Sequence, residues 1–284
     1  GKELWAASVG RAMPKFPQHP SNTWATETPV ADASGVVAFI GPTGTLAAFD
    51  TTGKARWKVE LGVHAMHEGY GTGSSPAILE GKVFVQSFSA EQGWLACFDA
   101  RNGKELWRIT HEASTSWSSP LVWRNRMRTE LVVSSGKRIT SHAPDSGREL
   151  WRLTGVNGPT MSSFAADAET LYFGQASAWS VPPNPPLYAL SAGAEGDLSP
   201  AKGSSELEGQ VWSQRLSSPA MSSPVAADGL LYVVMQNLLT CRDAASGEKL
   251  YEERVEGLVT IAASPIVVGD KLLLLAEEGH AAFV

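Results

Sequence analysis

Short apolar runs alternate with polar turns along the whole chain, and no stretch shows the periodicity of an amphipathic helix. Residues 77–99 illustrate the pattern. An apolar run at 77–79 meets the turn Glu80-Gly81, residues 82–87 alternate, and a second apolar run covers 93–98 after a polar loop. A further turn at 99–103 leads into Glu105-Leu-Trp107. Four short strands joined by tight turns fit these residues, so the pattern predicts an all-β fold.

The same unit recurs, and two landmarks mark each copy. Each copy starts with a small polar residue that proline usually follows: Thr28-Pro29, Ser75-Pro76, Ser119-Pro120, Ser163-Phe164, Ser223-Pro224 and Ser264-Pro265. Each copy closes on a turn and an aromatic residue, at Asp50, Gly53 and Trp57; Asp99, Gly103 and Trp107; Gly147 and Trp151; Trp212; and Asp243, Gly247 and Tyr251. Four-stranded units that repeat every 40 to 60 residues or so are typical of the blades of a β-propeller.

The closing residues have a structural explanation. An aspartate at the end of the third strand can accept hydrogen bonds from turn amides, and glycine supplies the left-handed backbone that the turn needs. The aromatic ring then falls on the outermost strand, where it can pack against the neighbouring blade. We therefore interpret these positions as docking residues between blades, without a chemical function.

The closing motif carries a resemblance to a known family. The chain resembles the pyrroloquinoline-quinone-like (PQQ-like, quinoprotein-type) β-propeller repeats, whose docking pattern is Ala-x-Asp-x-x-x-Gly-x-x-x-Trp. The copies at Cys97 to Trp107 and Cys241 to Tyr251 keep its spacing, with cysteine in place of alanine. Similar proteins include bacterial envelope proteins with PQQ-binding-like repeats and the propeller lipoprotein of the outer-membrane barrel assembly machinery. The resemblance implies an eight-bladed ring.

The number of blades stays open at this point. Six blade starts lie in the chain, the segment after Ser264 supplies three strands, and the segment ending at Trp5 supplies a fourth strand only. Either the two ends share a blade and close a six-bladed ring, or the chain is part of an eight-bladed ring truncated at both ends. We favour the second reading, with residues 1–284 as one propeller domain.

Composition narrows the functional classes. The net charge is −6 and no basic run is present, which argues against nucleic-acid binding. No apolar stretch reaches the roughly 20 residues of a membrane span, so we expect no transmembrane segment. Cys97 and Cys241 occupy equivalent places in separate blades, so we expect two buried free thiols. No signal peptide is visible, and the family resemblance implies a periplasmic or extracytoplasmic location.

Two loops concentrate residues that could contact a ligand. Residues 62–73 hold His64, His67 and Tyr70 among four glycines, and the following blade-to-blade loop adds His111 and Trp117. Loops on a rigid scaffold often carry function. We predict a ligand-binding site at these five residues, with all but His64 facing one funnel. The spacing of the histidines differs from known helical zinc motifs, so no metal is predicted.

A further stretch, residues 176–210, interrupts the repeat. Its proline and glycine content excludes regular strands through most of it, although Leu187-Tyr-Ala-Leu190 keeps the third strand. Ser191 stands where the closing aspartate would be. The stretch is either a tolerated insertion or a long loop with a function.

Three functional hypotheses follow. We favour a non-catalytic binding or scaffold module of the bacterial cell envelope, with a protein or another envelope component as partner and without a cofactor or catalytic residues. The second is a PQQ- and calcium-dependent alcohol dehydrogenase; the resemblance implies an adjacent cysteine pair for such enzymes, and this sequence has none. The third is a carbohydrate-binding or carbohydrate-cleaving propeller that uses Tyr70, Trp117 and Trp179 as stacking surfaces.

Overall fold

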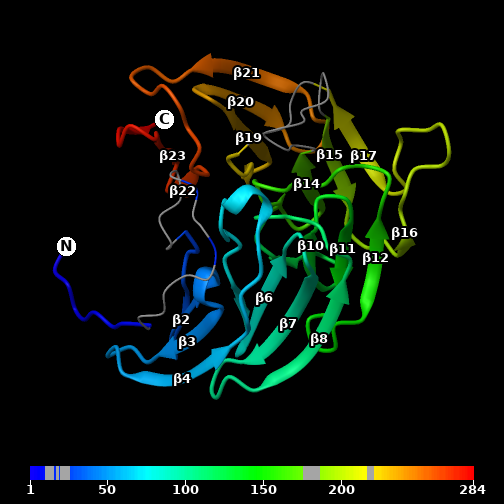
Figure 1. Cartoon of the computed structure of the whole chain (residues 1–284). Helices are drawn as coiled ribbons and strands as arrows, with labels where there is room; N and C mark the ends of the chain where they lie inside the picture. Colours follow the sequence, from blue (N-terminus) through cyan, green and yellow to red (C-terminus); the bar gives the residue numbers. More distant parts are fainter. Residues whose placement is uncertain (10–15, 17–18, 20–25, 175–185, 216–220) are drawn as a thin grey trace. The chain divides into compact units, whose positions relative to one another are not determined.

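The computed structural model describes residues 1–9, 16, 19, 26–174, 186–215 and 221–284, and it is built from short antiparallel sheets (Figure 1). The described residues contain no α-helix, and two single turns of 3-10 helix, η1 (Gly41–Thr43) and η2 (His67–Gly69), are the helical elements in these ranges. The predicted all-β fold of four-stranded antiparallel blades is confirmed. No helix of the described residues has the length and apolar character needed to cross a membrane.

Six sheets follow one another along the sequence, and we number them as blades 1 to 6. Blades 1, 2 and 3 consist of β1 (Val30–Asp32), β2 (Gly35–Ile40), β3 (Thr45–Phe49) and β4 (Ala55–Glu60); β5 (Ala77–Leu79), β6 (Lys82–Phe88), β7 (Gly93–Asp99) and β8 (Glu105–His111); and β9 (Leu121–Arg124), β10 (Thr129–Ser134), β11 (Ile139–His142) and β12 (Glu149–Leu153). Blades 4, 5 and 6 consist of β13 (Ala165–Ala166), β14 (Thr170–Gly174), β15 (Leu187–Ser191) and β17 (Gln210–Gln214); β18 (Val225–Ala227), β19 (Leu230–Met235), β20 (Leu238–Asp243) and β21 (Lys249–Arg254); and β22 (Ile266–Val268), β23 (Lys271–Leu275) and β24 (Ala281–Phe283).

The chain forms two compact units. Unit 1 contains Gly1–Val122 and the turn Ala143–Arg148, and unit 2 contains Trp123–His142 and Glu149–Val284. Each unit has its own core. In unit 1 the core includes Val37, Leu46, Val83 and Phe98, and unit 2 has two clusters, around Leu187 and around Leu274. The single-domain reading and the number of blades in a ring stay predictions.

The turn between the third and fourth strands has the expected local chemistry. In blade 2, Asp99 Oδ1 accepts the Arg101 amide at 2.8 Å, and the Gly103 amide donates to the Asp99 carbonyl at 2.8 Å. Gly103 has φ +72°, a left-handed conformation that favours glycine. Hydrogen bonds from the Arg101 side chain and the turn amide lower the pKa of Asp99 to about 2. In the turn after Asp243, the Gly247 amide likewise donates to the Asp243 carbonyl at 2.9 Å, and Asp243 Oδ1 accepts the Ser246 amide.

The closing tryptophans dock onto the glycine of the next turn. In unit 1, Trp57 Nε1 donates to the Ala100 carbonyl at 2.9 Å, and its ring lies against Gly103, where an added Cβ would come within 2.6 Å of the ring. In unit 2, Trp212 Nε1 donates to the Ala244 carbonyl at 3.0 Å, and its ring lies against Gly247. We call this arrangement the indole latch. The same pairing joins Trp5 to Gly53 and Thr51, and Trp107 to Gly147 and Pro144.

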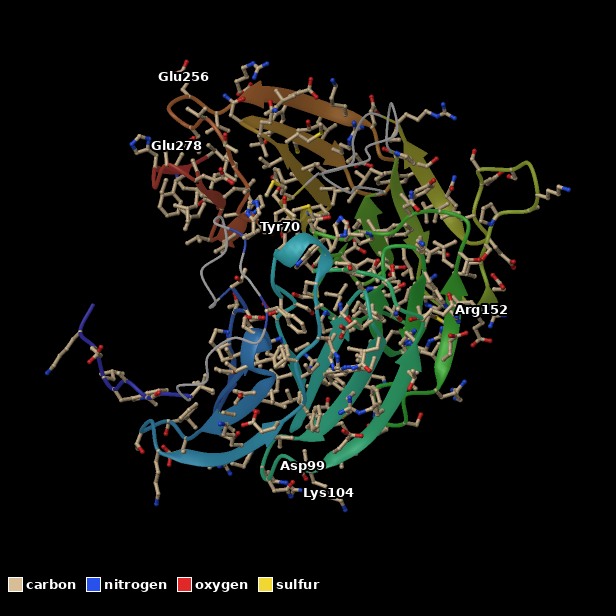
Figure 2. The ribbon with its side chains drawn as sticks, in the orientation of Figure 1. Tyr70, Asp99, Lys104, Arg152, Glu256 and Glu278 are labelled. Atoms are coloured by element: carbon tan, nitrogen blue, oxygen red, sulfur yellow. The ribbon has the colours of Figure 1, made fainter. Side chains whose placement is uncertain are left out.

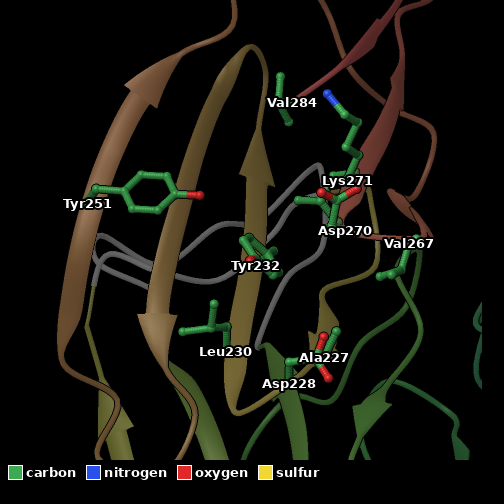
Figure 3. A pocket seen from close by; sticks show the side chains of 11 residues that line it. Ala227, Asp228, Leu230, Tyr232, Tyr251, Val267, Asp270, Lys271 and Val284 are labelled. Atoms are coloured by element: carbon green, nitrogen blue, oxygen red, sulfur yellow. The ribbon is translucent and has the colours of Figure 1, made fainter.

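Two closing aromatics lack this latch. Trp151 is buried, and its Nε1 donates at 2.7 Å to the carboxylate of Glu130 in its own blade. Tyr251 is 42 % exposed beside a cavity of about 280 Å³, lined by residues of blades 5 and 6 (Figure 3). Blade 6 is three-stranded in the described residues, so no closing turn of that blade lies against the Tyr251 ring.

The N-terminal segment does not form the fourth strand that its sequence suggests. Residues 1–9 contain no strand, although Trp5 makes an indole latch. A closing motif therefore docks through its indole even without a strand neighbour.

Hydrogen bonds between neighbouring blades explain why each blade starts with a small polar residue. The Thr28 amide donates to Ser75 Oγ at 2.9 Å in unit 1, and the Ser75 amide donates to Ser119 Oγ at 2.9 Å. In unit 2 the Ser163 amide donates to Ser223 Oγ at 2.8 Å. Each of these hydroxyls thus accepts the amide at the same place in the preceding blade, which requires a small polar side chain.

Replacing Ser223 with alanine should lower the free energy of unfolding of the protein by about 1 kcal/mol, because the Ser163 amide loses its acceptor. Urea denaturation followed by tryptophan fluorescence measures this difference. Ser223→Thr keeps the hydroxyl and serves as the control. Equal destabilisation by both variants would show that the hydrogen bond does not contribute to stability and that the side-chain volume at this position determines it.

The stretch after β15 covers the edge of blade 3. Its strand β16 (Gly196–Asp197) pairs in parallel with β12, and the Leu198 amide donates to the Arg152 carbonyl at 2.9 Å. Leu198 and Leu207 are buried. Because an uncovered edge strand is prone to non-native pairing, the described part of this insertion has a structural role. Residues 176–185 lie outside the described residues.

Candidate functional site

Three loops meet at one end of the strands of unit 1. Residues 61–73 connect β4 to β5, residues 89–92 connect β6 to β7, and residues 112–118 follow β8. Together with residues 26–28 we call them the unit 1 loop face. Figure 2 shows Tyr70, from the first of these loops, far from Asp99 and Lys104, which mark the opposite end of β7 and β8.

Hydrogen bonds fasten the glycine-rich loop, residues 61–73, to the surrounding segments. The Ala90 amide donates to the Ala65 carbonyl at 3.3 Å, and the His19 amide donates to the Gly69 carbonyl at 2.9 Å. Trp117 Nε1 donates to the Gly71 carbonyl at 2.7 Å. A loop held at three points presents its side chains in a fixed arrangement, which reduces the entropic cost of binding.

Aromatic rings form a contact group on this loop face. The His19 and Tyr70 rings stack with their centroids 4.4 Å apart, and the Tyr70 and Trp117 rings meet edge to face at 6.2 Å. Two of the five predicted ligand-binding residues, Tyr70 and Trp117, are thus in contact. His19 joins them and was not among the predicted residues, although its sequence, between two prolines, lies in a loop.

The remaining predicted residues lie against other partners. His64 Nε2 is 2.6 Å from Gln92 Nε2, and His64 Nδ1 is 3.4 Å from Glu91 Oε2. This geometry fits a ring that carries its proton on Nδ1 and accepts from the glutamine amide. The His111 ring meets the Phe88 ring at 5.3 Å, and His67 is exposed. Whether these side chains share one funnel with Tyr70 stays a prediction, and Trp179 lies outside the described residues.

A buried carboxylate that sequence reasoning missed lies beside the aromatic group. Glu27 is 6 % exposed; its Oε1 accepts the Thr72 hydroxyl and the Gly41 amide, the latter at 3.2 Å. Burial raises the pKa of Glu27, and Oε2 has no hydrogen-bond partner among the described residues. The sequence did hold a signal, because Glu27 stands two residues before Pro29, where four other copies have serine: Ser74, Ser118, Ser162 and Ser222.

The described residues hold neither a metal-binding group nor paired cysteines. Within the described ranges, no group of three or more His, Cys, Asp or Glu side chains is placed to hold a metal ion. Cys97 and Cys241 are free, buried and in different units. Burial raises the pKa of the Cys97 thiol to about 12, so this thiol stays protonated and unreactive at neutral pH. The absence of a cofactor stays a prediction.

Repeated four-stranded blades joined by indole latches define a β-propeller protein of the PQQ-like repeat class. The family model described as "Outer membrane protein assembly factor BamB" matches residues 1–92, 42–181 and 202–284, and the chain belongs to this family. No curated protein matches the chain.

Three solved structures are similar to the chain. BamB from Moraxella catarrhalis is 15% identical, with a TM-score of 0.59 over 91% of this chain and 72% of that protein. A europium-containing methanol dehydrogenase is 12% identical, with a TM-score of 0.46 over 89% of this chain and 71% of that protein. A quinohemoprotein alcohol dehydrogenase from Pseudomonas putida HK5 is 13% identical, with a TM-score of 0.48 over 89% of this chain and 62% of that protein. At 15% identity the likeness to the Moraxella catarrhalis protein concerns the fold alone.

Proposed function

We propose that this protein is a non-catalytic binding module of the bacterial cell envelope and that the unit 1 loop face binds a protein partner. The observation that carries the proposal is the family match over most of the chain, because the family is described as an outer membrane protein assembly factor. The family match supports a protein partner and an extracytoplasmic location. No catalytic step is assigned to any residue.

The loop face has the physical properties of a protein-binding surface. Hydrogen bonds to three of its backbone carbonyls fasten its main loop, so little order has to be gained on binding. Tyr70 and Trp117 are half-buried, and tyrosine and tryptophan are enriched among residues that contribute most to protein interfaces. Exposed His67 lies at the tip of the same loop, within reach of a partner.

A photo-crosslinking residue at position 67 tests this proposal in cells of the source bacterium. The expected result is one reproducible adduct with an envelope protein, identified by mass spectrometry, which then binds the purified chain directly. The matched control places the same crosslinker at Lys104, which is exposed at the opposite end of the blade. An adduct of equal yield from position 104, or none from position 67 in a folded protein, would contradict the proposal.

A further inference from the structure

The three loops of the unit 1 loop face carry acidic and aromatic residues and neither lysine nor arginine. Their carboxylates include those of Glu91 and Glu112, which follow β6 and β8. The Glu91 side chain is 53% exposed, and Glu112 is exposed as well. Glu27 adds a buried carboxylate behind this rim. Surfaces of one charge sign attract partners of the opposite sign, so charge complementarity favours a basic partner segment.

Buried acceptors without partners lie next to the aromatic group. Glu27 is tied to Thr72, and the neighbouring Gly73 packs on Trp117, since a Cβ added to Gly73 would lie 3.3 Å from the Trp117 ring. Ser116 and Ser118, on either side of Trp117, have buried hydroxyls without a hydrogen-bond partner among the described residues. Glu27 Oε2 also lacks a hydrogen-bond partner among the described residues. Buried polar atoms are normally satisfied, so this cluster has hydrogen-bonding capacity for a ligand that brings donors.

A guanidinium group matches these features together. It carries five donors and no acceptor, it stacks on aromatic rings, and it pairs with carboxylates. Unit 1 already uses this chemistry once, because the guanidinium carbon of Arg108 lies 4.4 Å from the centre of the Trp94 ring. A lysine would supply the charge but would stack less well on Trp117.

We propose that the unit 1 loop face binds an arginine-containing segment of its protein partner, with the guanidinium packed beside Tyr70 and Trp117 and directed toward Glu27. This inference rests on the proposed function and specifies the chemistry of the partner. The exposed carboxylates of Glu91 and Glu112 attract the segment, and the aromatic pair supplies the contact surface.

Calorimetric titration of the full chain with a synthetic peptide tests the inference. The probe is the acetylated, amidated peptide Gly-Ser-Arg-Gly-Ser-Arg-Gly, and its citrulline analogue is the matched control, because citrulline keeps the shape and removes the charge. The arginine peptide is expected to bind about tenfold more tightly than the citrulline peptide. Equal affinities, or no binding of either peptide to a folded chain, would overturn the inference.

Variants of the chain locate the binding. Glu112→Gln and Tyr70→Leu are each expected to lower the affinity for the arginine peptide by about tenfold. Glu27→Gln is expected to lower this affinity as well, and it tests the buried carboxylate. Glu80→Gln removes an exposed carboxylate at the opposite end of blade 2 and should leave the affinity unchanged. Thermal melting reports whether each variant is folded. If Glu80→Gln weakens binding as much as Glu112→Gln, the attraction is non-specific and the proposed surface is wrong.

The two proposals fail separately. If the crosslink at position 67 captures an envelope protein whose crosslinked segment contains no arginine, and the peptide does not bind, the proposed function stands and the arginine inference is wrong. If the arginine peptide binds as expected but no envelope protein is captured, the surface recognises arginine and the proposed partner class is wrong.

Discussion

Replacing Glu130 with alanine will lower the free energy of unfolding of the protein by about 3–5 kcal/mol, the loss expected when one partner of a buried ion pair is removed. Glu130 is fully buried and accepts four hydrogen bonds: from Trp151 Nε1 at 2.7 Å, Ser141 Oγ at 2.5 Å, Asn125 Nδ2 at 3.0 Å and Arg128 Nε at 3.0 Å. Alanine would leave all four donors without this acceptor in the interior. Urea denaturation of the variant and the parent protein measures the difference.

Glu195 provides the matched control for Glu130. It pairs with the same arginine, Arg128, at 2.9 Å, but its side chain is 78% exposed. Glu195→Ala should therefore change the free energy of unfolding by less than about 1 kcal/mol, as for other surface ion pairs. A loss of similar size in both variants would show that the charge of Arg128 alone matters and that the buried network around Glu130 does not.

This network replaces a missing indole latch. The turn after β15 has Ser191 in place of the closing aspartate and continues into the insertion, so Trp151 has no turn of the usual kind to dock on. Its indole donates to Glu130, and Arg128 joins Glu130 to the insertion through the Ala194 carbonyl at 2.5 Å. A carboxylate and an arginine thus connect Trp151 to the same segment that covers the edge of β12.

Replacing Trp212 with alanine will also destabilise the protein by about 3–5 kcal/mol. The indole is 7% exposed, meets the Tyr172 ring at 5.8 Å and donates to the Ala244 carbonyl. Truncation would open a cavity between blades 4 and 5. It would also leave the Ala244 carbonyl without the indole N–H that donates to it. Chemical denaturation with fluorescence and far-ultraviolet circular dichroism measures the loss.

Tyr251 is the natural control for Trp212, because it holds the same position one blade later without a docked turn. Because Tyr251 is 42% exposed, Tyr251→Ala should lower the free energy of unfolding by less than about 1 kcal/mol. Equal losses from Trp212→Ala and Tyr251→Ala would show that the ring itself stabilises its own blade and that docking onto the next turn is not what matters.

Much of the fold could be predicted from the sequence because its signals are local. Asp99 and Gly103 define their turn within five residues, and the alternation at 82–87 defines β6, so neither needs knowledge of the rest of the chain. The candidate site was less predictable. Tyr70 and Trp117 were predicted as site residues only from their residue types, whereas their contact arises because two loops fold against each other. The partners of His64 and His111 could not be predicted from the sequence.

The sequence by itself determined the strands, the closing turns and the position of each docking aromatic, because these depend on backbone preferences and on residues only a few positions apart. The tertiary structure decided which indoles find a turn, that Glu130 accepts Trp151, that β16 covers β12, and that Glu27 is buried beside Thr72. These outcomes join residues from separate segments, and burial and hydrogen-bond geometry between such segments arise only when the chain has packed.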